Sequence, residues 1–398
     1  MSQAYKGERL HIAILGRCNT GKSTVLNLIA GQRAAIVSPR PGTTGDPLGL
    51  PFELPPLGPV TLYDTAGLDE TSDLGDLRRE AGRKVLAGAD LAVLVTDEAG
   101  IGKWEKDIVS SLRSLGTPFI LLFNKDDLRP ASETDQNWCR EGSIPFLSLN
   151  AAKEQDPTRL REAIVLLAPE APERRPLIRD ILAPGSAVIL VTPIDASAPK
   201  GRLIAPQVQV LRELVDANMP ALVLQPPALA HALTLLREAP ALVITDSQVV
   251  REVAALVPEE IPLTTFSIIL ARYKADFALL LEGARAIDSL QDGARVLVAE
   301  ACSHHAQDDD IARIKLPRLL KGHTGRELTV EVYSGKDFPD DLERFDLVIH
   351  CGGCMLNPGE MRRRLRICAA AGVKATNFGM AISLCQGVLE RACRPFIQ

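Results

Sequence analysis

The chain has 398 residues, of which 46% are hydrophobic, 24% are charged and 4% are aromatic, and its formal net charge is −5. A chain of this length can form two or three domains, each with its own hydrophobic core. The acidic balance and the scarcity of aromatic rings argue against a nucleic-acid partner, because nucleic acids select basic surfaces and stacking platforms.

The first residues, MSQAYKGERL, are polar and charged, so we expect no secretory signal. No apolar stretch reaches the roughly 18 residues that a membrane-spanning helix needs. The eight cysteines are too sparse for a disulfide scaffold and are better interpreted as thiols, some of them metal ligands. We therefore expect a cytoplasmic protein without a membrane partner.

Five apolar runs alternate with amphipathic stretches between Leu10 and Ala168: LHIAIL, VTLYD, LAVLVTD, PFILLFNK and PFLSLN. Their separations suit crossover helices, which predicts an α/β domain with a mostly parallel, doubly wound sheet over residues 1–168. The alternation of strands and helices recurs further along the chain, but no convincing internal sequence repeat accompanies it.

A phosphate-binding loop is predicted at residues 16–23, GRCNTGKS, which fits the pattern G-x-x-x-x-G-K-S/T between a strand and a helix. Its backbone N–H groups would wrap phosphate oxygens, Lys22 would reach the β- and γ-phosphates, and the Ser23 hydroxyl would bind Mg²⁺. After the second run comes DTAG, in which the Asp64 carboxylate can hold Mg²⁺ through water and the Gly67 N–H can contact the γ-phosphate.

Guanine specificity is predicted by Asn124-Lys125-Asp126-Asp127, which matches the box N-K-x-D. The Asp127 carboxylate would accept hydrogen bonds from guanine N1–H and the 2-amino group. Because adenine lacks this pair of donors, we expect GTP to be selected over ATP. Asn150-Ala151 lies where a fifth, weaker guanine loop usually occurs.

The middle of the chain contains no ligand cluster and no phosphate loop. Residues 169–184 are rich in proline and charge and are interpreted as a linker. An α/β module over residues 185–264 follows, in which VQVLRELVDAN predicts a helix with one apolar face. That face is expected to hold Val208, Leu211, Leu214 and Val215. A scaffold or self-association role is the simplest interpretation of this module.

A metal site is predicted in the last segment, residues 265–398. Two expected strands, ARVLVAEA and FDLVIHC, each end where a cysteine–histidine block begins. The blocks are Cys302-Ser303-His304 and His350-Cys351-Gly352-Gly353-Cys354. Ligands commonly lie at the carboxyl ends of parallel strands, so two strand ends can converge on one site. Cys302, Cys351 and Cys354 are the expected ligand set, because thiolates suit zinc or iron–sulfur clusters.

Spacing alone does not separate the two kinds of metal centre. Three cysteines with one histidine would make a closed tetrahedral zinc site. Three cysteines with a weaker fourth donor would instead suit a [4Fe–4S] cluster with one exchangeable iron. The candidate fourth donors are Glu300, His304, His305 and His350.

The nucleotide-binding motifs resemble the GTPase branch that contains TrmE and Era. Thr43-Thr44 resembles its switch I, whose threonine closes on Mg²⁺, and Asn19 matches the loop asparagine that binds potassium in cation-activated members. Leu68 stands where Ras-like enzymes carry the glutamine that orients water, so we expect slow, potassium-stimulated hydrolysis. The residues expected to be catalytic are Lys22, Thr44, Asp64 and Gly67. Those expected to bind the nucleotide are Gly16, Asn19, Thr20, Gly21, Lys22, Ser23, Thr24, Thr43, Asn124, Lys125, Asp127, Asn150 and Ala151.

The domain order, together with the motifs C-x-H and H-C-x-x-C, resembles that of the HydF family, the GTPases of [FeFe]-hydrogenase maturation. The resemblance covers essentially the entire chain. The resemblance implies a GTP-binding domain, a middle dimerisation domain and a C-terminal domain whose three cysteines hold a [4Fe–4S] cluster. It also implies a scaffold or carrier for the diiron subcluster of the H-cluster. The implied partners are a second copy of the chain, apo-[FeFe]-hydrogenase and two radical-SAM maturases.

Two other functions stay open on the residues alone. One is a tRNA- or ribosome-associated GTPase with a structural zinc module, for which Arg362-Arg363-Arg364 supplies some basic character. The other is a metal-sensing GTPase switch without a carrier role. The iron and zinc content of the anaerobically purified protein would discriminate the structural-zinc hypothesis from the iron–sulfur-cluster hypothesis.

Overall fold

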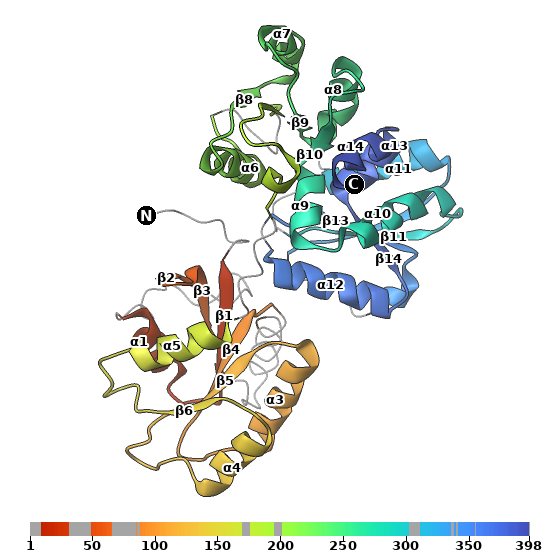
Figure 1. The fold of residues 1–398 in the computed structure, drawn as a ribbon. Helices are drawn as coiled ribbons and strands as arrows, with labels where there is room; N and C mark the ends of the chain where they lie inside the picture. The colour runs from red at the N-terminus through yellow and green to blue at the C-terminus, as the bar shows by residue number, and fades with distance from the viewer. Residues whose placement is uncertain are drawn as a thin grey trace. The chain divides into compact units, whose positions relative to one another are not determined.

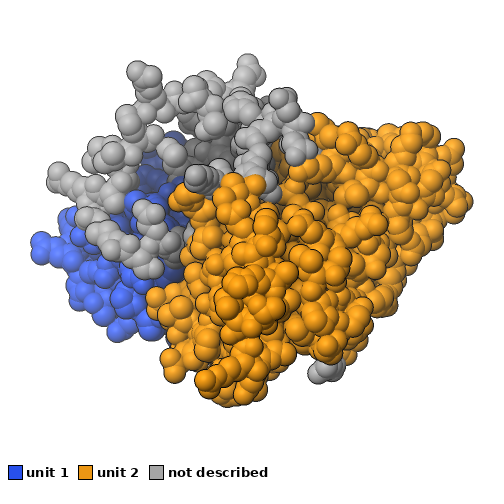
Figure 2. Space-filling view, turned by 90° about the horizontal axis from the view of Figure 1, so that it is seen from above, with its two compact units in different colours: residues 1–173 blue, residues 174–398 orange. Residues whose placement is uncertain are grey.

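The computed structural model describes residues 9–31, 49–65, 85, 88–168, 176–194, 201–301, 311–335, 338–339, 341–354 and 356–397. The chain divides into two compact units, residues 1–173 and 174–398, which Figure 2 distinguishes by colour. In the part of the chain that is described, no helix is both long and apolar enough to cross a membrane.

Unit 1 is built on a six-stranded sheet in the order β2-β3-β1-β4-β5-β6 (Figure 1). All neighbouring strands are parallel except the β2–β3 pair, which is antiparallel. The strands are β1 (Leu10–Gly16), β2 (Gly49–Leu54), β3 (Gly58–Asp64), β4 (Leu91–Thr96), β5 (Phe119–Phe123) and β6 (Phe146–Ser148). The predicted doubly wound α/β fold is confirmed.

Helices cover both faces of this sheet, which explains why its central strands are apolar without interruption (Figure 1). Ile12 and Ile14 of β1 face α1 and α5, whereas Ala13 and Leu15 face α3 and α4. The helices are α1 (Lys22–Ala30), α3 (Lys103–Leu115), α4 (Glu133–Glu141) and α5 (Thr158–Leu167).

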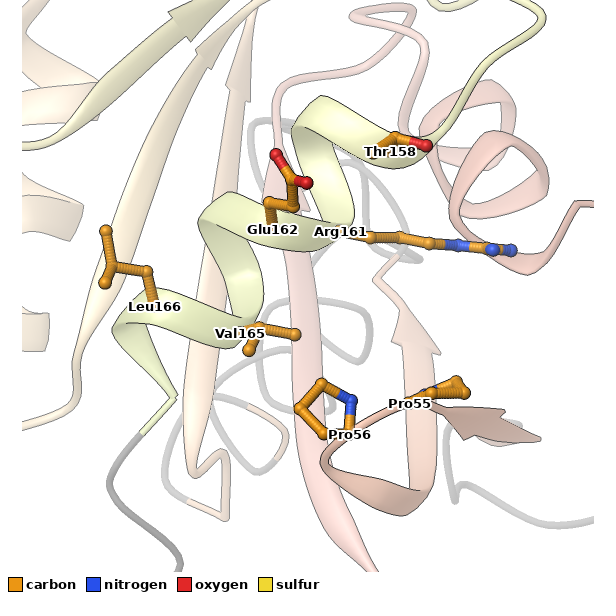
Figure 3. Close-up of a pocket in the computed structure, with 7 residues that line it drawn as sticks. All are labelled: Pro55, Pro56, Thr158, Arg161, Glu162, Val165 and Leu166. Atoms are coloured by element: carbon orange, nitrogen blue, oxygen red, sulfur yellow. The ribbon is translucent and has the colours of Figure 1, made fainter.

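A pocket of about 370 Å³ lies between α5 and the turn that joins β2 to β3 (Figure 3). It is lined by Pro55, Pro56, Thr158, Arg161, Glu162, Val165 and Leu166. The turn precedes β3, so this part of the pocket lies near the amino-terminal ends of the parallel strands, away from their carboxyl ends. It therefore takes no part in the predicted phosphate site.

Unit 2 contains two four-stranded parallel sheets, ordered β10-β9-β7-β8 and β12-β11-β13-β14. In each, the first strand in the sequence pairs with the second and the third, and the third pairs with the fourth. The strands are β7 (Val188–Val191), β8 (Ala221–Leu224), β9 (Leu242–Thr245), β10 (Leu263–Thr265), β11 (Arg295–Ala299), β12 (Thr329–Tyr333), β13 (Leu347–His350) and β14 (Lys374–Asn377). The unit therefore repeats one topology, although its sequence does not.

Helix α9 (Phe266–Lys274) belongs to the cores of both sheets. Ile268 and Ala271 pack with side chains of the β11 sheet, whereas Ile269 and Leu270 pack with those of the β7 sheet. A helix with apolar residues on two opposite sides is expected at such a central place. The other α-helices of the unit are α6 (Ala205–Asp216), α7 (Leu229–Leu235), α8 (Val250–Leu256), α10 (Phe277–Arg285), α11 (Leu316–Thr324), α12 (Pro358–Ala370), α13 (Phe378–Cys385) and α14 (Leu389–Cys393).

The predicted apolar face of α6 is wrong at one end. The helix buries Gln207, Val210 and Leu214, but Val215 is 59% exposed. Residues 207, 210 and 214 follow the spacing of three and four that points one helix face at the sheet, and Val215 falls outside that face. Leu177 and Ile178, from the segment expected to be a linker, are buried in the same core, and their N–H groups donate to the Glu213 carboxylate.

Candidate functional site

The phosphate loop connects β1 to α1, as its sequence pattern requires. Gly21 begins the helix with a φ of +91°, and a Cβ there would lie 2.3 Å from the Asn124 amide nitrogen. Glycine is therefore needed at this position for both its conformation and its size. The Lys22 ammonium donates to the Arg17 carbonyl at 2.6 Å, so the loop itself holds this cation in place.

The two residues predicted to hold Mg²⁺ lie side by side. The Ser23 hydroxyl donates to the Asp64 carboxylate at 2.5 Å. Burial raises the pKa of Asp64, and the Ser23 hydrogen bond and the Lys22 charge partly offset this effect. The hydroxyl and the carboxylate thus converge next to the phosphate loop, where Mg²⁺ binds in this class of site. Thr43, Thr44, Gly67 and Leu68 lie outside the described residues.

Asn124 connects the phosphate loop to the fifth guanine loop. Its amide nitrogen donates to the Thr20 carbonyl at 2.8 Å, and its amide oxygen accepts from the Ala151 N–H at 2.9 Å. The side chain is buried, so both bonds form away from water. Asn124 thereby connects Thr20, which lies 104 residues before it, to Ala151, which lies 27 residues after it.

The carboxylate of Asp127, which is predicted to select guanine, is already hydrogen-bonded within unit 1. It accepts hydrogen bonds from the Lys153 ammonium at 2.6 Å and from the Asn150 amide. The ammonium is the main cause of the lowered pKa of Asp127. Sequence reasoning missed Lys153, which lies two residues after Ala151. It also missed the Arg17–Glu105 ion pair, although Glu105 occupies the third position of α3, where capping carboxylates are common.

In unit 2 the two predicted strand ends do converge. Strands β11 and β13 are adjacent and parallel, with Ala299 opposite His350, so the two strands that precede the ligand blocks end at one edge of the sheet. Strand β12 lies on one side of this pair and β14 on the other. The chain therefore reverses its strand order between β11 and β13, which makes this edge a topological switch point, the usual place for a ligand in an open α/β sheet.

The Cys351 sulfur is surrounded by backbone N–H groups. It accepts from the Ala301 N–H at 3.1 Å and from the Gly353 N–H at 3.4 Å. Burial raises the pKa of the Cys351 thiol to about 11, so without a metal the thiol is protonated at neutral pH. Gly353 has a φ of +63°, and a Cβ there would lie 2.4 Å from a Met361 methyl carbon. The loop thus depends on glycine at this position.

Both ring nitrogens of the buried His350 have hydrogen-bond partners. Nε2 lies 3.0 Å from an Arg364 guanidinium nitrogen, and Nδ1 lies 3.0 Å from the Cys351 carbonyl. Since a guanidinium only donates and a carbonyl only accepts, the ring is neutral with its proton on Nδ1. Burial and the Arg364 charge lower the pKa of His350 to about 3. Either nitrogen would have to leave its partner before it could bind a metal.

Glu300 is held in a similar way. Its carboxylate accepts from the Arg313 guanidinium at 2.9 Å and from the Ser334 hydroxyl at 3.1 Å. The other candidate ligands, Cys302, His304 and His305, lie outside the described residues. Within the described ranges, no group of three or more His, Cys, Asp and Glu side chains is close enough to hold a metal ion. The remaining thiols of this unit lie in helices, and burial raises the pKa of Cys368 and Cys393 to about 12.

Family models match the chain in three consecutive segments. Residues 11–125 match the 50S ribosome-binding GTPase model. Residues 177–275 match the hydrogen maturase F dimerization domain, and residues 278–395 match the hydrogen maturase F tetramerization domain. The chain belongs to the hydrogen maturase F family. The resemblance to HydF is therefore confirmed, with a GTPase domain followed by two oligomerisation domains.

Curated relatives of the GTPase domain are found outside the hydrogen maturase F family. GTPase Der of Solidesulfovibrio magneticus is 37% identical over 164 residues, which are 40% of this chain and 36% of that protein. The tRNA modification GTPase MnmE of Prochlorococcus marinus is 36% identical over 201 residues, 48% of this chain and 42% of that protein. The chain thus spans less than half the length of these relatives. The crystal structure of Era from Aquifex aeolicus bound to GDP and AlF4⁻ matches 41% of this chain and 58% of that chain, with 24% identity and a TM-score of 0.35.

Proposed function

We propose that this protein is a potassium-stimulated GTPase that holds a [4Fe–4S] cluster on Cys302, Cys351 and Cys354 and assembles or delivers the diiron subcluster of [FeFe]-hydrogenase. The observation that carries the proposal is that β11 and β13, the strands that precede the two cysteine blocks in the sequence, end side by side at a switch point. It is joined by membership in the hydrogen maturase F family. The proposed partners are apo-hydrogenase and the radical-SAM maturases, in the cytoplasm.

The environment of Cys351 fits a cluster. Two backbone N–H groups point at its sulfur, and such bonds stabilise the charge of a cluster thiolate and tune the cluster. When bound, a cluster with one position that cysteine does not hold supplies an iron at which ligands can exchange. Cys302, Cys351 and Cys354 would hold the other three irons.

The fourth ligand is proposed to bind weakly. Glu300 and His350 each hydrogen-bond to an arginine. Either side chain would have to break a charge-assisted or buried hydrogen bond before it could bind the iron. The free energy lost with that hydrogen bond offsets much of the free energy gained from coordination. A weak fourth ligand suits a carrier, because cargo must attach at this position and later leave it.

Anaerobic reconstitution with iron and sulfide tests the cluster. We expect about four iron atoms per chain and a brown protein, and loss of this iron in Cys302→Ala, Cys351→Ala and Cys354→Ala. GTP hydrolysis should be largely retained in these variants, because the two sites lie in separate units. Cys385→Ala, which changes a thiol of helix α13, is the matched control. A colourless protein with one zinc per chain would instead favour the tRNA- or ribosome-associated alternative.

The carrier role needs its own experiment. The reconstituted protein is loaded with a synthetic diiron mimic, freed of excess mimic and mixed with apo-hydrogenase. Hydrogen evolution is expected with wild-type protein and not with Cys351→Ala treated in the same way. Equal hydrogenase activation by both proteins would leave the cluster without a role in delivery.

Self-association is proposed to use the outer edge of the first sheet of unit 2. Among the described strands, β8 forms this edge, and its Val223 is 42% exposed. Val215, on the neighbouring helix α6, adds a second exposed apolar side chain. An open edge strand with apolar side chains readily pairs with another strand, and the matched family model for this region is a dimerization domain.

A further inference from the structure

Lys274 is a buried cation at the end of α9, and it holds the loop that carries Cys354. Its side chain is 1% exposed. The ammonium donates to the Gly353 carbonyl at 2.8 Å and to the Leu356 carbonyl at 2.9 Å. These two carbonyls flank Cys354, so one side chain fixes the backbone on both sides of this expected ligand.

The loop also passes close to α9 at Gly352. A Cβ on Gly352 would lie 3.4 Å from the Ser267 hydroxyl oxygen and 3.8 Å from a Leu270 methyl carbon. Ser267 is itself held, because its carbonyl accepts from the Asn377 amide at 2.8 Å. Lys274 therefore acts from a rigid helix shared by two cores and not from a mobile surface chain.

An ammonium group is costly to bury even where carbonyl oxygens accept its hydrogen bonds. Burial of an ammonium group costs several kcal/mol, whereas a neutral amide could donate the same two hydrogen bonds at a much smaller cost. A cation is favoured here if negative charge binds nearby. Three cysteine thiolates around a [4Fe–4S] core leave a net negative charge, which grows by one when the core is reduced.

We propose that Lys274 is a positioning residue for the cluster. Its hydrogen bonds keep the Cys351–Cys354 loop in the conformation that binds iron, and its charge stabilises the reduced cluster. This inference rests on the proposed function, since it needs a cluster on these cysteines.

The charge and the hydrogen bonds can be separated by three variants. Lys274→Gln keeps donors but removes the charge, Lys274→Met removes both, and Lys274→Arg keeps both. Each protein is reconstituted anaerobically, its iron is counted, and its cluster is titrated with dithionite while the reduced form is followed by electron paramagnetic resonance. Thermal unfolding of the cluster-free proteins reports on folding.

We expect Lys274→Gln to retain most of its iron but to be at least tenfold harder to reduce, a shift of 59 mV to more negative potential for one electron. Lys274→Met should also lose iron, and Lys274→Arg should keep a midpoint near that of wild type. Arg272→Gln, which removes another buried cation of α9 that pairs with Asp180, should leave the midpoint unchanged. Should Lys274→Gln fail to fold, the comparison of Lys274→Met with Lys274→Arg decides.

Equal midpoints in wild type, Lys274→Gln and Lys274→Met would overturn the charge role, and equal iron content in all variants would overturn the positioning role. In both cases the wild type still binds its cluster. Wild-type protein that binds no cluster contradicts the proposed function itself, so the two failures are distinguishable.

Discussion

The Nε2 atom of His350 lies 3.0 Å from a guanidinium nitrogen of Arg364, within the second unit. In the sequence His350 directly precedes Cys351, and this neighbourhood predicts that both residues bind the same metal centre. In the fold its ring is already used by Arg364 and by the Cys351 carbonyl. His350 therefore links helix α12 to the Cys351–Cys354 loop, and we expect this link to affect the stability of the protein.

The cluster-free protein should lose stability as the pH falls. Unfolded histidine takes up a proton near pH 6.5, whereas folded His350 does so only near pH 3. Between these values the unfolded state binds one more proton, so the free energy of unfolding falls by up to ~1.4 kcal/mol per pH unit. Urea unfolding between pH 5 and 7.5 should show a smaller slope in His350→Gln. The exposed His231→Gln is the control, and an unchanged slope in His350→Gln would contradict the assignment.

Asp127→Asn should exchange guanine for xanthine specificity. The carboxylate is expected to accept hydrogen bonds from two guanine donors, and loss of two charge-assisted bonds at about 1.5–3 kcal/mol each should lower GTP affinity by at least about a hundredfold. The new amide can donate to the extra xanthine oxygen, so binding of XTP should rise. Nucleotide affinities measured by calorimetry check this, with Asp126→Asn as the neighbouring control. Retention of GTP binding in Asp127→Asn would remove this box from guanine recognition.

Potassium should stimulate GTP hydrolysis more than sodium does. Asn19 is exposed in the phosphate loop in a left-handed conformation with a φ of +63°, and residue 68 is leucine and not a water-orienting glutamine. Phosphate release in equal concentrations of the two chlorides tests this expectation. Asn19→Ala should lower the rate in potassium to the rate in sodium. Equal rates in both salts for the wild type would refute the role of potassium.

Val223→Lys should disrupt self-association. A charge on the exposed face of β8 opposes edge-to-edge pairing, so the molar mass measured by light scattering should fall by about half or more in low salt. Leu128→Lys changes an exposed leucine of unit 1 and serves as the control. If the mass of Val223→Lys equals that of wild type, association uses another surface.

The central strands could be predicted from the sequence because helices cover both of their faces, which leaves continuous apolar runs such as HIAIL. Strands β2, β10, β12 and β14 escaped prediction. Strand β2 contains a proline, β10 has three residues, and β12 (TVEVY) and β14 (KATN) carry exposed or polar residues. Short or half-exposed strands give a weak apolar signal.

The site followed a similar division. Motif spacing identified the phosphate loop, the Asp64–Ser23 pair and the adjacent ends of strands β11 and β13, because each depends on residues at or next to a strand end. It did not identify Lys274, Arg364 or Lys153. The contacts of Lys274 with Gly353 and Leu356 span 79 and 82 residues, and no local pattern carries that pairing.

Helix α9 has a consequence for how this family can be dissected. The dimerization model ends at residue 275 and the tetramerization model begins at residue 278, yet α9 completes the core of the second sheet as well as the first. A C-terminal fragment that begins at that boundary would lack Ile268, which packs with Leu297 and Val348, and it would also lack Lys274. The smallest fragment expected to keep both sheets intact is the whole of unit 2, residues 174–398. We therefore expect a fragment of unit 2 either to keep both self-association and cluster binding or to lose both.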